Sequence, residues 1–226
     1  MRLYHYLEAK WALDDIRRRR LKLSKIDDMN DPYEWKCVRA LDEPSQWALE
    51  KTEIEIVEIY SVQCYSRSWN NVLMWSHYGD RHKGICLGFD IPDDLTREVQ
   101  YLESPELVEN VADASTEEKI RLIDLLMGAK YHGWSYEQEI RVNASRTDMD
   151  EETHQYFVDF SERLKLREVI AGAKFSMSKG PIEDALKGYP GDVQIVKAKR
   201  SETRFEIVVD ENGFNADAAT TGLPFK

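Results

Sequence analysis

The sequence has few cysteines and no long hydrophobic run. Its three cysteines, Cys37, Cys64 and Cys86, show no metal-site spacing, and their odd number argues against a disulfide framework. No window reaches the roughly 20 apolar residues that a membrane helix needs, and the opening stretch MRLYHYLEAK has no apolar core of signal-peptide length. These absences predict a soluble, cytoplasmic protein that does not bind membranes.

The sequence also lacks the common motifs of metal, nucleotide and hydrolase sites. His77 and His82 are five positions apart, which does not place them on one helix face, so we expect no metal centre. Neither a P-loop, nor a dinucleotide fingerprint, nor a G-x-S-x-G nucleophile turn is present. Cys86 lies inside the apolar run GICLGF, which favours an inert core thiol over a nucleophile.

The balance of charge argues against one broad class of partner. The formal net charge is −11, which opposes docking on the phosphate backbone of a nucleic acid over a wide face. The only dense basic run is IRRRR at 16–20, and a solvated helix end explains it better than a nucleic-acid site does. We therefore expect no broad nucleic-acid-binding surface.

Apolar periodicity predicts more strands than helices. The strands are expected at 2–6, 21–24, 60–68, 84–91, 134–142, 154–160, 166–172, 192–199 and 203–210. The helices are expected at 7–20, 45–58, 71–79, 116–131 and 178–187. Residues 45–58 are ambiguous because IEIVEI also alternates as a strand does. The pattern predicts a mixed, largely antiparallel α+β fold with flanking helices, as one domain over 1–211 with a weakly structured tail at 212–226.

A capping box marks the start of the helix expected at 116–131. Ser115 followed by Glu118 has the S-x-x-E spacing in which each residue satisfies a backbone N–H at the helix start. The inward-facing residues of this helix are expected to be Ile120, Ile123, Leu126 and Met127.

The stretch WSYEQEIRV at 134–142 carries the strongest signal for chemistry. As a strand it would place Glu137, Glu139 and Arg141 on one face, with aromatic and aliphatic residues on the other. Two interpretations stay open. The acids are catalytic if this face lines a cleft, whereas they form a solvated strand face balanced by Arg141 if it does not.

Two more polar and aromatic clusters occur in the chain, YHY at 4–6 and CYSRSWNNVLMWSHYGDRH at 64–82. A hydrogen-bonded strand histidine is an alternative for His5, and core packing is an alternative for Trp69 and Trp75. In the loop segment NDPYE, Asn30 and Asp31 are expected to cap a turn. Each cluster has an ordinary structural explanation, but the three together favour a shared site.

The quoted segments resemble a known family. LYHY, ALDDI, LKLS and NDPYE, then CYSRSWNNVLMWSHYGDRHKGICLGFD, WSYEQEIRV and LREVIAG, are similar to the bacterial and phage family called domain of unknown function 2971. The resemblance runs from about residue 3 to 209, and the family label implies no activity.

A fainter resemblance concerns the order of the elements. A strand with His, an aromatic strand with Arg and a late strand with Glu is similar to ADP-ribosyltransferases, among them DNA-modifying toxins, and to RNA 2′-phosphotransferases. It implies that NAD is a substrate, which is consumed by hydrolysis or by transfer to a protein or nucleic-acid acceptor that the sequence does not identify. The implied cofactor-binding residues are His5 for a ribose, Tyr65 and Arg67 for nicotinamide, and the nearby Trp75, His77 and Tyr78.

The same resemblance assigns catalytic roles to the acids at 137–139. Glu139 would hold the reacting ribose, where a fixed carboxylate stabilises the positive charge of the transition state. Arg141 would keep Glu139 ionised, and Glu137 would serve as a general base or assist the acceptor. These roles require the opening imidazole, the mid-chain rings and Glu139 to surround one hollow.

A second hypothesis is a non-catalytic module that binds a nucleotide or a protein partner. The aromatic residues and the acidic surface suit it equally well. Phage defence or toxin biology is the expected setting for an NAD-consuming enzyme, and phage defence or counter-defence is the expected setting for the binding module.

Overall fold

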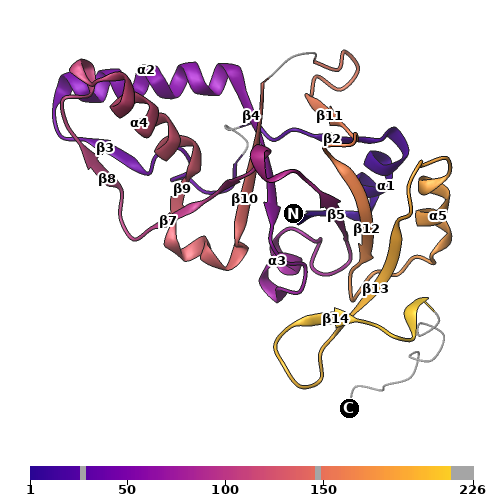
Figure 1. Ribbon diagram of the computed structural model, residues 1–226. Helices are drawn as coiled ribbons and strands as arrows, with labels where there is room; N and C mark the ends of the chain where they lie inside the picture. Colours follow the sequence, from indigo (N-terminus) through magenta and orange to yellow (C-terminus); the bar gives the residue numbers. More distant parts are fainter. Residues whose placement is uncertain (26–28, 146–148, 215–226) are drawn as a thin grey trace. The chain divides into compact units, whose positions relative to one another are not determined.

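The computed structural model describes residues 1–25, 29–145 and 149–214 (Figure 1). As predicted, the fold is mixed α+β, with a large, mostly antiparallel sheet and flanking helices. The chain forms two compact units. The first contains residues 1–21, 65–92 and the described residues from 159 onward, and the second contains 22–64 and 93–158. Each unit thus joins segments far apart in the sequence, and the single domain expected over 1–211 stays a prediction.

The first unit is built on a five-strand arrangement in the order β14-β13-β12-β5-β1. The pair β12 and β13 is parallel, whereas the other neighbours are antiparallel. Its elements are β1 (Arg2–Leu7), α1 (Ala9–Arg18), α3 (Val72–His77), β5 (Ile85–Asp90), β12 (Lys165–Ala171), α5 (Gly180–Leu186), β13 (Gln194–Arg200) and β14 (Ile207–Val209). Three further strands contain a point where the chain passes between units: β2 (Arg20–Lys22), β4 (Tyr60–Ser66) and β11 (Phe157–Asp159).

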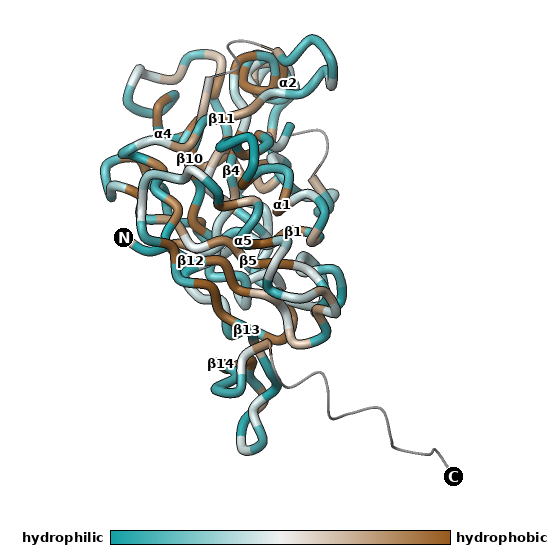
Figure 2. Tube along the Cα trace, turned by 90° about the vertical axis from the view of Figure 1, so that its right-hand side faces the viewer, coloured by the Kyte–Doolittle hydropathy of each residue, from teal (hydrophilic) through white to brown (hydrophobic). Residues whose placement is uncertain are grey.

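Strand β5 forms the centre of the first unit's core, as its apolar run predicts. Ile85, Cys86, Leu87 and Phe89 are all 0% exposed. Figure 2 shows hydrophobic colouring along β5 and along parts of β12 and β13. Because both faces of β5 are buried, its sequence lacks the alternation of a half-exposed strand.

The basic run at 16–20 forms a helix end, as the sequence indicates. Helix α1 buries Ala12 and Ile16, and it ends at Arg19 in the left-handed conformation with φ of 57°. The Arg19 guanidinium donates hydrogen bonds to the carbonyls of Ala185 at 3.0 Å and Lys187 at 2.7 Å. It therefore satisfies two carbonyls at the end of α5.

The second unit packs two long helices over short strands. Its elements are β3 (Val38–Ala40), α2 (Glu43–Ile59), η2 (Asp93–Leu95), β6 (Arg97–Glu98), β7 (Gln100–Leu102), β8 (Glu106–Val108), η3 (Val111–Asp113), α4 (Thr116–Gly128), β9 (Ala129–Tyr131), η4 (His132–Glu137) and β10 (Glu139–Ser145). Strands β3 and β8 pair in parallel, as do β7 and β9, whereas β10 and β6 are antiparallel. Leu49 and Ile56 of α2 meet Leu122 and Leu126 of α4 in one hydrophobic cluster.

The two long helices begin where their caps predict. The Asp42 side chain accepts a hydrogen bond from the Ser45 N–H at 2.8 Å, which helps to fix the ambiguous 45–58 stretch as helix α2. Ser115 and Glu118 form both bonds of the predicted capping box at the start of α4. Helix α4 ends at Gly128 because 129–131 form strand β9 instead. The expectation that Ile120 faces inward is wrong, since it is 55% exposed.

The strand expected over 134–142 is wrong in its first half. Residues His132–Glu137 form a 3₁₀ turn, Gln138 adopts a left-handed conformation with φ of 46°, and β10 begins only at Glu139. The local turn overrides the alternation that the sequence suggested. Strands expected at 154–160 and 203–210 are also shorter, since β11 and β14 keep only three residues each. The whole segment DDMNDPYE at 27–34 is expected to be a loop, and its residues 27 and 28, like residues 215–226 of the predicted tail, lie outside the described residues.

Candidate functional site

Five charged side chains meet in the interior of the second unit. This buried ion cluster consists of Glu34, Lys130, Glu137, Glu139 and Arg141, which come from the NDPYE loop, β9, the end of η4 and β10. No side chain of the cluster is more than 5% exposed. Burial of charge on this scale is costly unless each charge is paired, and the contacts below show how it is paired.

Glu139 is held by both cations of the cluster. Arg141 Nε donates to Glu139 Oε1 at 2.8 Å, and Lys130 Nζ donates to Glu139 Oε2 at 2.9 Å. Arg141 Nη2 adds a third contact to Oε2 at 3.3 Å. Glu139 and Arg141 therefore share a strand face as predicted, and both carboxylate oxygens of Glu139 are already engaged by protein donors.

Glu137 and Glu34 complete the cluster from outside the strand. Lys130 Nζ donates to Glu137 Oε2 at 2.6 Å, so Glu137 joins its expected partners through Lys130 although it lies on a 3₁₀ turn. Arg141 Nη2 donates to Glu34 Oε1, and Arg141 Nη1 donates to the Met127 carbonyl at 3.0 Å. Lys130 Nζ lies 3.6 Å from Glu34 Oε2, which is an ion-pair contact beyond hydrogen-bond distance.

The cluster contains three carboxylates and two cations. Because the cations are too few, the carboxyl groups of the cluster differ in pKa. Burial raises the pKa of the Glu139 carboxyl, but Arg141 and Lys130 outweigh it and bring that pKa well below its usual range. Burial raises the pKa of the Glu34 carboxyl, and the two cations only partly offset it. Glu139 is thus held ionised, whereas the two cations do not fully compensate the charge of a Glu34 carboxylate.

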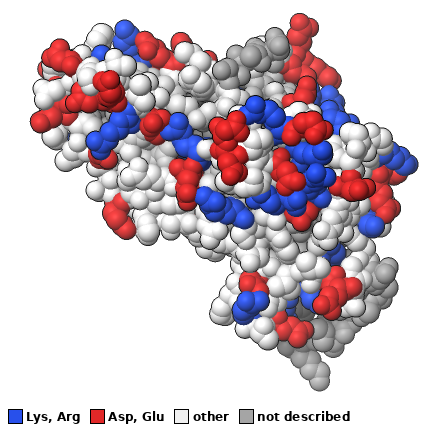
Figure 3. All heavy atoms as spheres, in the orientation of Figure 1, with Lys and Arg blue, Asp and Glu red and all other residues white. Residues whose placement is uncertain are grey.

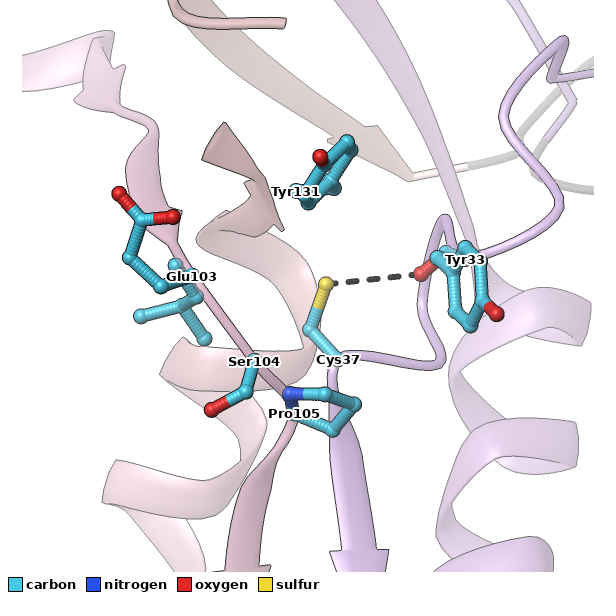
Figure 4. Close-up of a pocket in the computed structure, with 7 residues that line it drawn as sticks. Tyr33, Cys37, Glu103, Ser104, Pro105 and Tyr131 are labelled. Atoms are coloured by element: carbon cyan, nitrogen blue, oxygen red, sulfur yellow. Dashed lines mark hydrogen bonds between the residues drawn. The ribbon is translucent and has the colours of Figure 1, made fainter. Parts of the chain in front are cut away.

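A cavity of about 350 Å³ opens beside the cluster (Figure 4). We call it the tyrosine cavity, and its lining residues are Tyr33, Cys37, Leu102, Glu103, Ser104, Pro105 and Tyr131. Figure 4 shows the Cys37 sulfur in the middle, with Tyr33, Tyr131 and Glu103 on different sides of it. Tyr33 is 57% exposed and Tyr131 is 50% exposed, so both rings are open to a ligand.

Cys37 connects the tyrosine cavity with the charged residues behind it. Its thiol donates to the Tyr33 carbonyl at 3.5 Å. Burial, together with the negative charges of Glu34 and Asp31, raises the pKa of Cys37 to about 11. The thiol at the base of the cavity is therefore protonated at neutral pH and is a weak nucleophile.

The residues predicted to bind the cofactor lie in the first unit, and His5 and Trp75 lie on opposite faces of β1. The His5 and Tyr65 rings are 5.6 Å apart, so the structure brings these two together. Tyr6, the next residue on β1, points to the opposite face and packs against Trp75 at 5.2 Å. His5 and Trp75 therefore do not share one hollow within this unit.

Trp75 is a core residue. It is 0% exposed, and its Nε1 donates to the Trp69 carbonyl at 2.6 Å, so the packing alternative describes it better than a stacking platform does. His77 at the end of α3 is exposed, and its ring lies 6.2 Å from that of Tyr78. Arg67, just after β4, is also exposed. A cofactor role for His5, Tyr65, Arg67, His77 or Tyr78 stays a prediction.

Sequence reasoning missed two members of the cluster, Lys130 and Glu34. Lys130 interrupts the otherwise apolar run LLMGAKY, and a single lysine inside such a run was the available signal for a buried cation. Glu34 ends the NDPYE segment. In that segment Asp31 Oδ1 accepts from the Tyr33 N–H at 2.9 Å, so the expected turn cap is present.

Residues 74–142 match the family model described as "Protein of unknown function (DUF2971)". This match supports the resemblance predicted from the sequence over these 69 of the 226 residues. The DUF2971 segment includes Trp75, all of α4 and four of the five charged residues of the buried ion cluster. No curated protein and no solved structure shows a significant match to the chain, and the ADP-ribosyltransferase resemblance stays a prediction.

Three further observations concern metal binding, membrane helices and surface charge. Among the described residues, no group of three or more His, Cys, Asp or Glu side chains is arranged to hold a metal ion. In the same part of the chain, no helix combines the length and apolar character needed to cross a membrane. On the face shown in Figure 3, positive and negative side chains are interspersed.

Proposed function

We propose that the chain is a non-catalytic module that binds a nucleotide through a flat ring held in the tyrosine cavity. The observation that supports this function is the pair of half-exposed tyrosines around a cavity of about 350 Å³. Cavities of a few hundred Å³ with apolar and aromatic walls are the usual sites for small molecules. Tyrosine rings offer a flat face for stacking and a hydroxyl for hydrogen bonding.

The lining of the cavity favours a neutral or positively charged ring. Leu102 and Pro105 supply apolar wall, Glu103 supplies a negative charge, and no Lys or Arg is among the described residues that line it. The faces of tyrosine rings also attract cations. The phosphates of a nucleotide would therefore lie outside the cavity, with the base or the cationic nicotinamide ring inside.

The state of Glu139 favours binding over catalysis. A carboxylate that stabilises a developing positive charge must face the reacting sugar with its own charge uncompensated. Glu139 instead has both oxygens bonded to Arg141 and Lys130, and its side chain is only 4% exposed. In this arrangement the carboxylate maintains the fold of β10 and β9.

Consumption of NAD, by transfer to an acceptor or by hydrolysis, is our second candidate. The observation that favours it is the lowered pKa of Glu139, because the acid below the ribose must stay ionised. NAD consumption requires Glu139 to give up its contact with Lys130 or Arg141 and to contact the ribose of the substrate instead. A setting in phage defence and a cytoplasmic location remain part of this proposal.

A ligand titration tests the first candidate. Nicotinamide mononucleotide, NAD, adenosine and ATP are added separately while the melting temperature is recorded, because a ligand of the folded state raises it. We expect stabilisation by at least one of them, reduced in Tyr131→Ala and Tyr33→Ala. The matched control is Trp47→Ala, which removes an exposed aromatic ring from α2 in the same unit. If no compound stabilises the parent, or if the tyrosine variants respond as it does, the proposed function is wrong.

Nicotinamide release separates the two candidates. The protein is incubated with NAD alone and with added protein, DNA or RNA. Binding without release supports the non-catalytic module. Release that Glu139→Gln abolishes while the variant still melts cooperatively supports NAD consumption, whereas equal release by both proteins excludes Glu139 as the catalytic acid.

A further inference from the structure

A second cavity of the second unit lies on the NDPYE loop and has an acidic lining. This acidic cavity has a volume of about 620 Å³, and Asp31, Glu34 and Trp35 are among its lining residues. It also contains Glu53, Glu58 and Lys36, so four carboxylates face one ammonium group. Lys36 already forms an ion pair with Glu53. Its ammonium group is therefore not available to Asp31 and Glu34.

Three buried polar atoms at this cavity have no hydrogen-bond partner. They are Asp31 Oδ2, Glu34 Oε2 and Trp35 Nε1. Their residues are 5%, 7% and 3% exposed. Unsatisfied buried polar atoms are rare, and each one costs free energy of folding until a partner is supplied. Two of these atoms are anionic acceptors, and the third is a donor.

The buried ion cluster supplies an independent reason for a cation at the same place. Its three carboxylates exceed its two cations by one charge, and Glu34 belongs to both the cluster and the acidic cavity. The Glu34 Oε1 oxygen is bonded to Arg141, whereas Oε2 receives only the 3.6 Å ion-pair contact with Lys130. A further positive charge in the cavity would balance this excess.

The chemistry of the ligand follows from these atoms and from the walls between them. Among the described residues, no group of three or more His, Cys, Asp or Glu is arranged to hold a metal ion, and the apolar part of the lining suits an organic cation better. Pro32, Ile54 and Val57 provide apolar wall, which suits an aliphatic stem. Trp35 Nε1 requires an acceptor such as a carbonyl oxygen.

We propose that the acidic cavity binds a lysine or arginine side chain of a basic peptide. The charged group bonds to Asp31 and Glu34, the stem lies on the apolar wall, and a peptide carbonyl accepts from Trp35. The net charge of −11 would favour the approach of such a partner over long range.

Three small probes test the proposal on the full chain. Nα-acetyl-lysine N-methylamide and its arginine analogue carry the cation, the stem and the carbonyls. Nα-acetyl-norleucine N-methylamide keeps the stem and carbonyls without the charge. Each is titrated while the NMR signals of residues 31–35 are followed. We expect the two cationic probes to shift these signals in a saturable way and the norleucine probe to leave them unchanged.

The decisive variant is Asp31→Asn. Asparagine can keep the hydrogen bond from the Tyr33 N–H through its carbonyl oxygen, while it replaces the unpartnered oxygen by an NH₂ group. We expect the affinity for the cationic probes to fall about tenfold or more, since a charge-assisted hydrogen bond is lost. The matched control is Glu55→Gln, an exposed acid of α2 that does not line the cavity, and it should bind as the parent does.

Several outcomes would overturn the proposal. These are equal binding of the norleucine probe, unchanged affinity in Asp31→Asn, or no shift at 31–35 across the solubility range of both cationic probes. Because nucleotide binding is assigned to the tyrosine cavity, a Tyr131→Ala protein that still binds the cationic probes distinguishes this result from the proposed function.

Discussion

Arg141 Nε and Glu139 Oε1 lie 2.8 Å apart, on two residues of β10 that share one strand face in a water-excluded interior. Such a pair does not add much to stability compared with apolar residues of the same shape, but breaking it leaves a bare buried charge. The pair therefore makes the interior of the second unit sensitive to any change in its charges.

Loss of the guanidinium should destabilise the protein strongly. Arg141→Met leaves Glu139 and Glu34 without their main cation, and we expect the free energy of unfolding to fall by about 3–5 kcal/mol. Urea unfolding followed by circular dichroism measures it. The control is Arg121→Met, whose pair with Glu106 is exposed and should contribute about 1 kcal/mol or less. Similar losses in the two variants would contradict a structural role for the cluster.

The ionisation of Glu139 should make stability depend on pH in acid. Its folded pKa lies below the unfolded value of about 4.3, so the native state binds fewer protons in this range. The stability that Glu139 contributes is therefore complete above about pH 4.3 and is lost as the pH falls through the lower folded pKa.

Comparison with Glu139→Gln isolates this contribution. The variant should be less stable than the parent at neutral pH, and the gap should close as the pH falls, because a protonated Glu139 resembles glutamine. Unfolding in urea at a series of pH values measures the gap. A gap that stays constant down to the acid limit of folding would show that ionised Glu139 adds no stability.

The capping box makes a smaller and more local prediction. Ser115→Ala removes the acceptor for the Glu118 N–H at the start of α4, and the free energy of unfolding should fall by about 1 kcal/mol. Lys119 is an exposed residue in the first turns of α4. Lys119→Ala should change the free energy of unfolding by less than about 0.5 kcal/mol. Equal effects would mean that packing of Leu122 and Leu126 alone fixes the helix.

How far the sequence could predict this fold depends on how local each signal is. The capping box at Ser115 and the apolar run of β5 act within a few residues, and both expectations are confirmed. Alternation in WSYEQEIRV failed because Gln138 takes a left-handed conformation that lets Glu137 approach Lys130 from a turn. That contact depends on Lys130 in β9, which lies outside the segment whose alternation was read.

The candidate site shows the same division. Glu139 and Arg141 were identified together because they are two residues apart on a strand. Glu34 is 107 positions from Arg141, and nothing near NDPYE in the sequence indicates which distant cation it meets. The open faces of Tyr33 and Tyr131 likewise depend on chain segments that fold together only in three dimensions.

Thiol labelling offers a test of the tyrosine cavity that does not depend on enzymatic turnover. Cys37 lines the cavity with a pKa raised to about 11, so at pH 8 only about one molecule in a thousand carries the thiolate. Burial also raises the pKa values of Cys64 and Cys86, so the native protein should react with iodoacetamide far more slowly than the protein in urea. Mass spectrometry of peptides reports the rate at each cysteine, and a rate at Cys37 as fast as in urea would contradict a buried thiol.

A bound ring should slow the labelling of Cys37 alone. Nicotinamide mononucleotide at a stabilising concentration would cover the Cys37 sulfur from the side of Tyr33 and Tyr131, whereas Cys86 in β5 belongs to the first unit and should keep its rate. Equal protection of both cysteines would indicate general stabilisation of the fold, because a global effect slows every opening that exposes a thiol. Selective protection that disappears in Tyr131→Ala would place the ligand between the tyrosine rings.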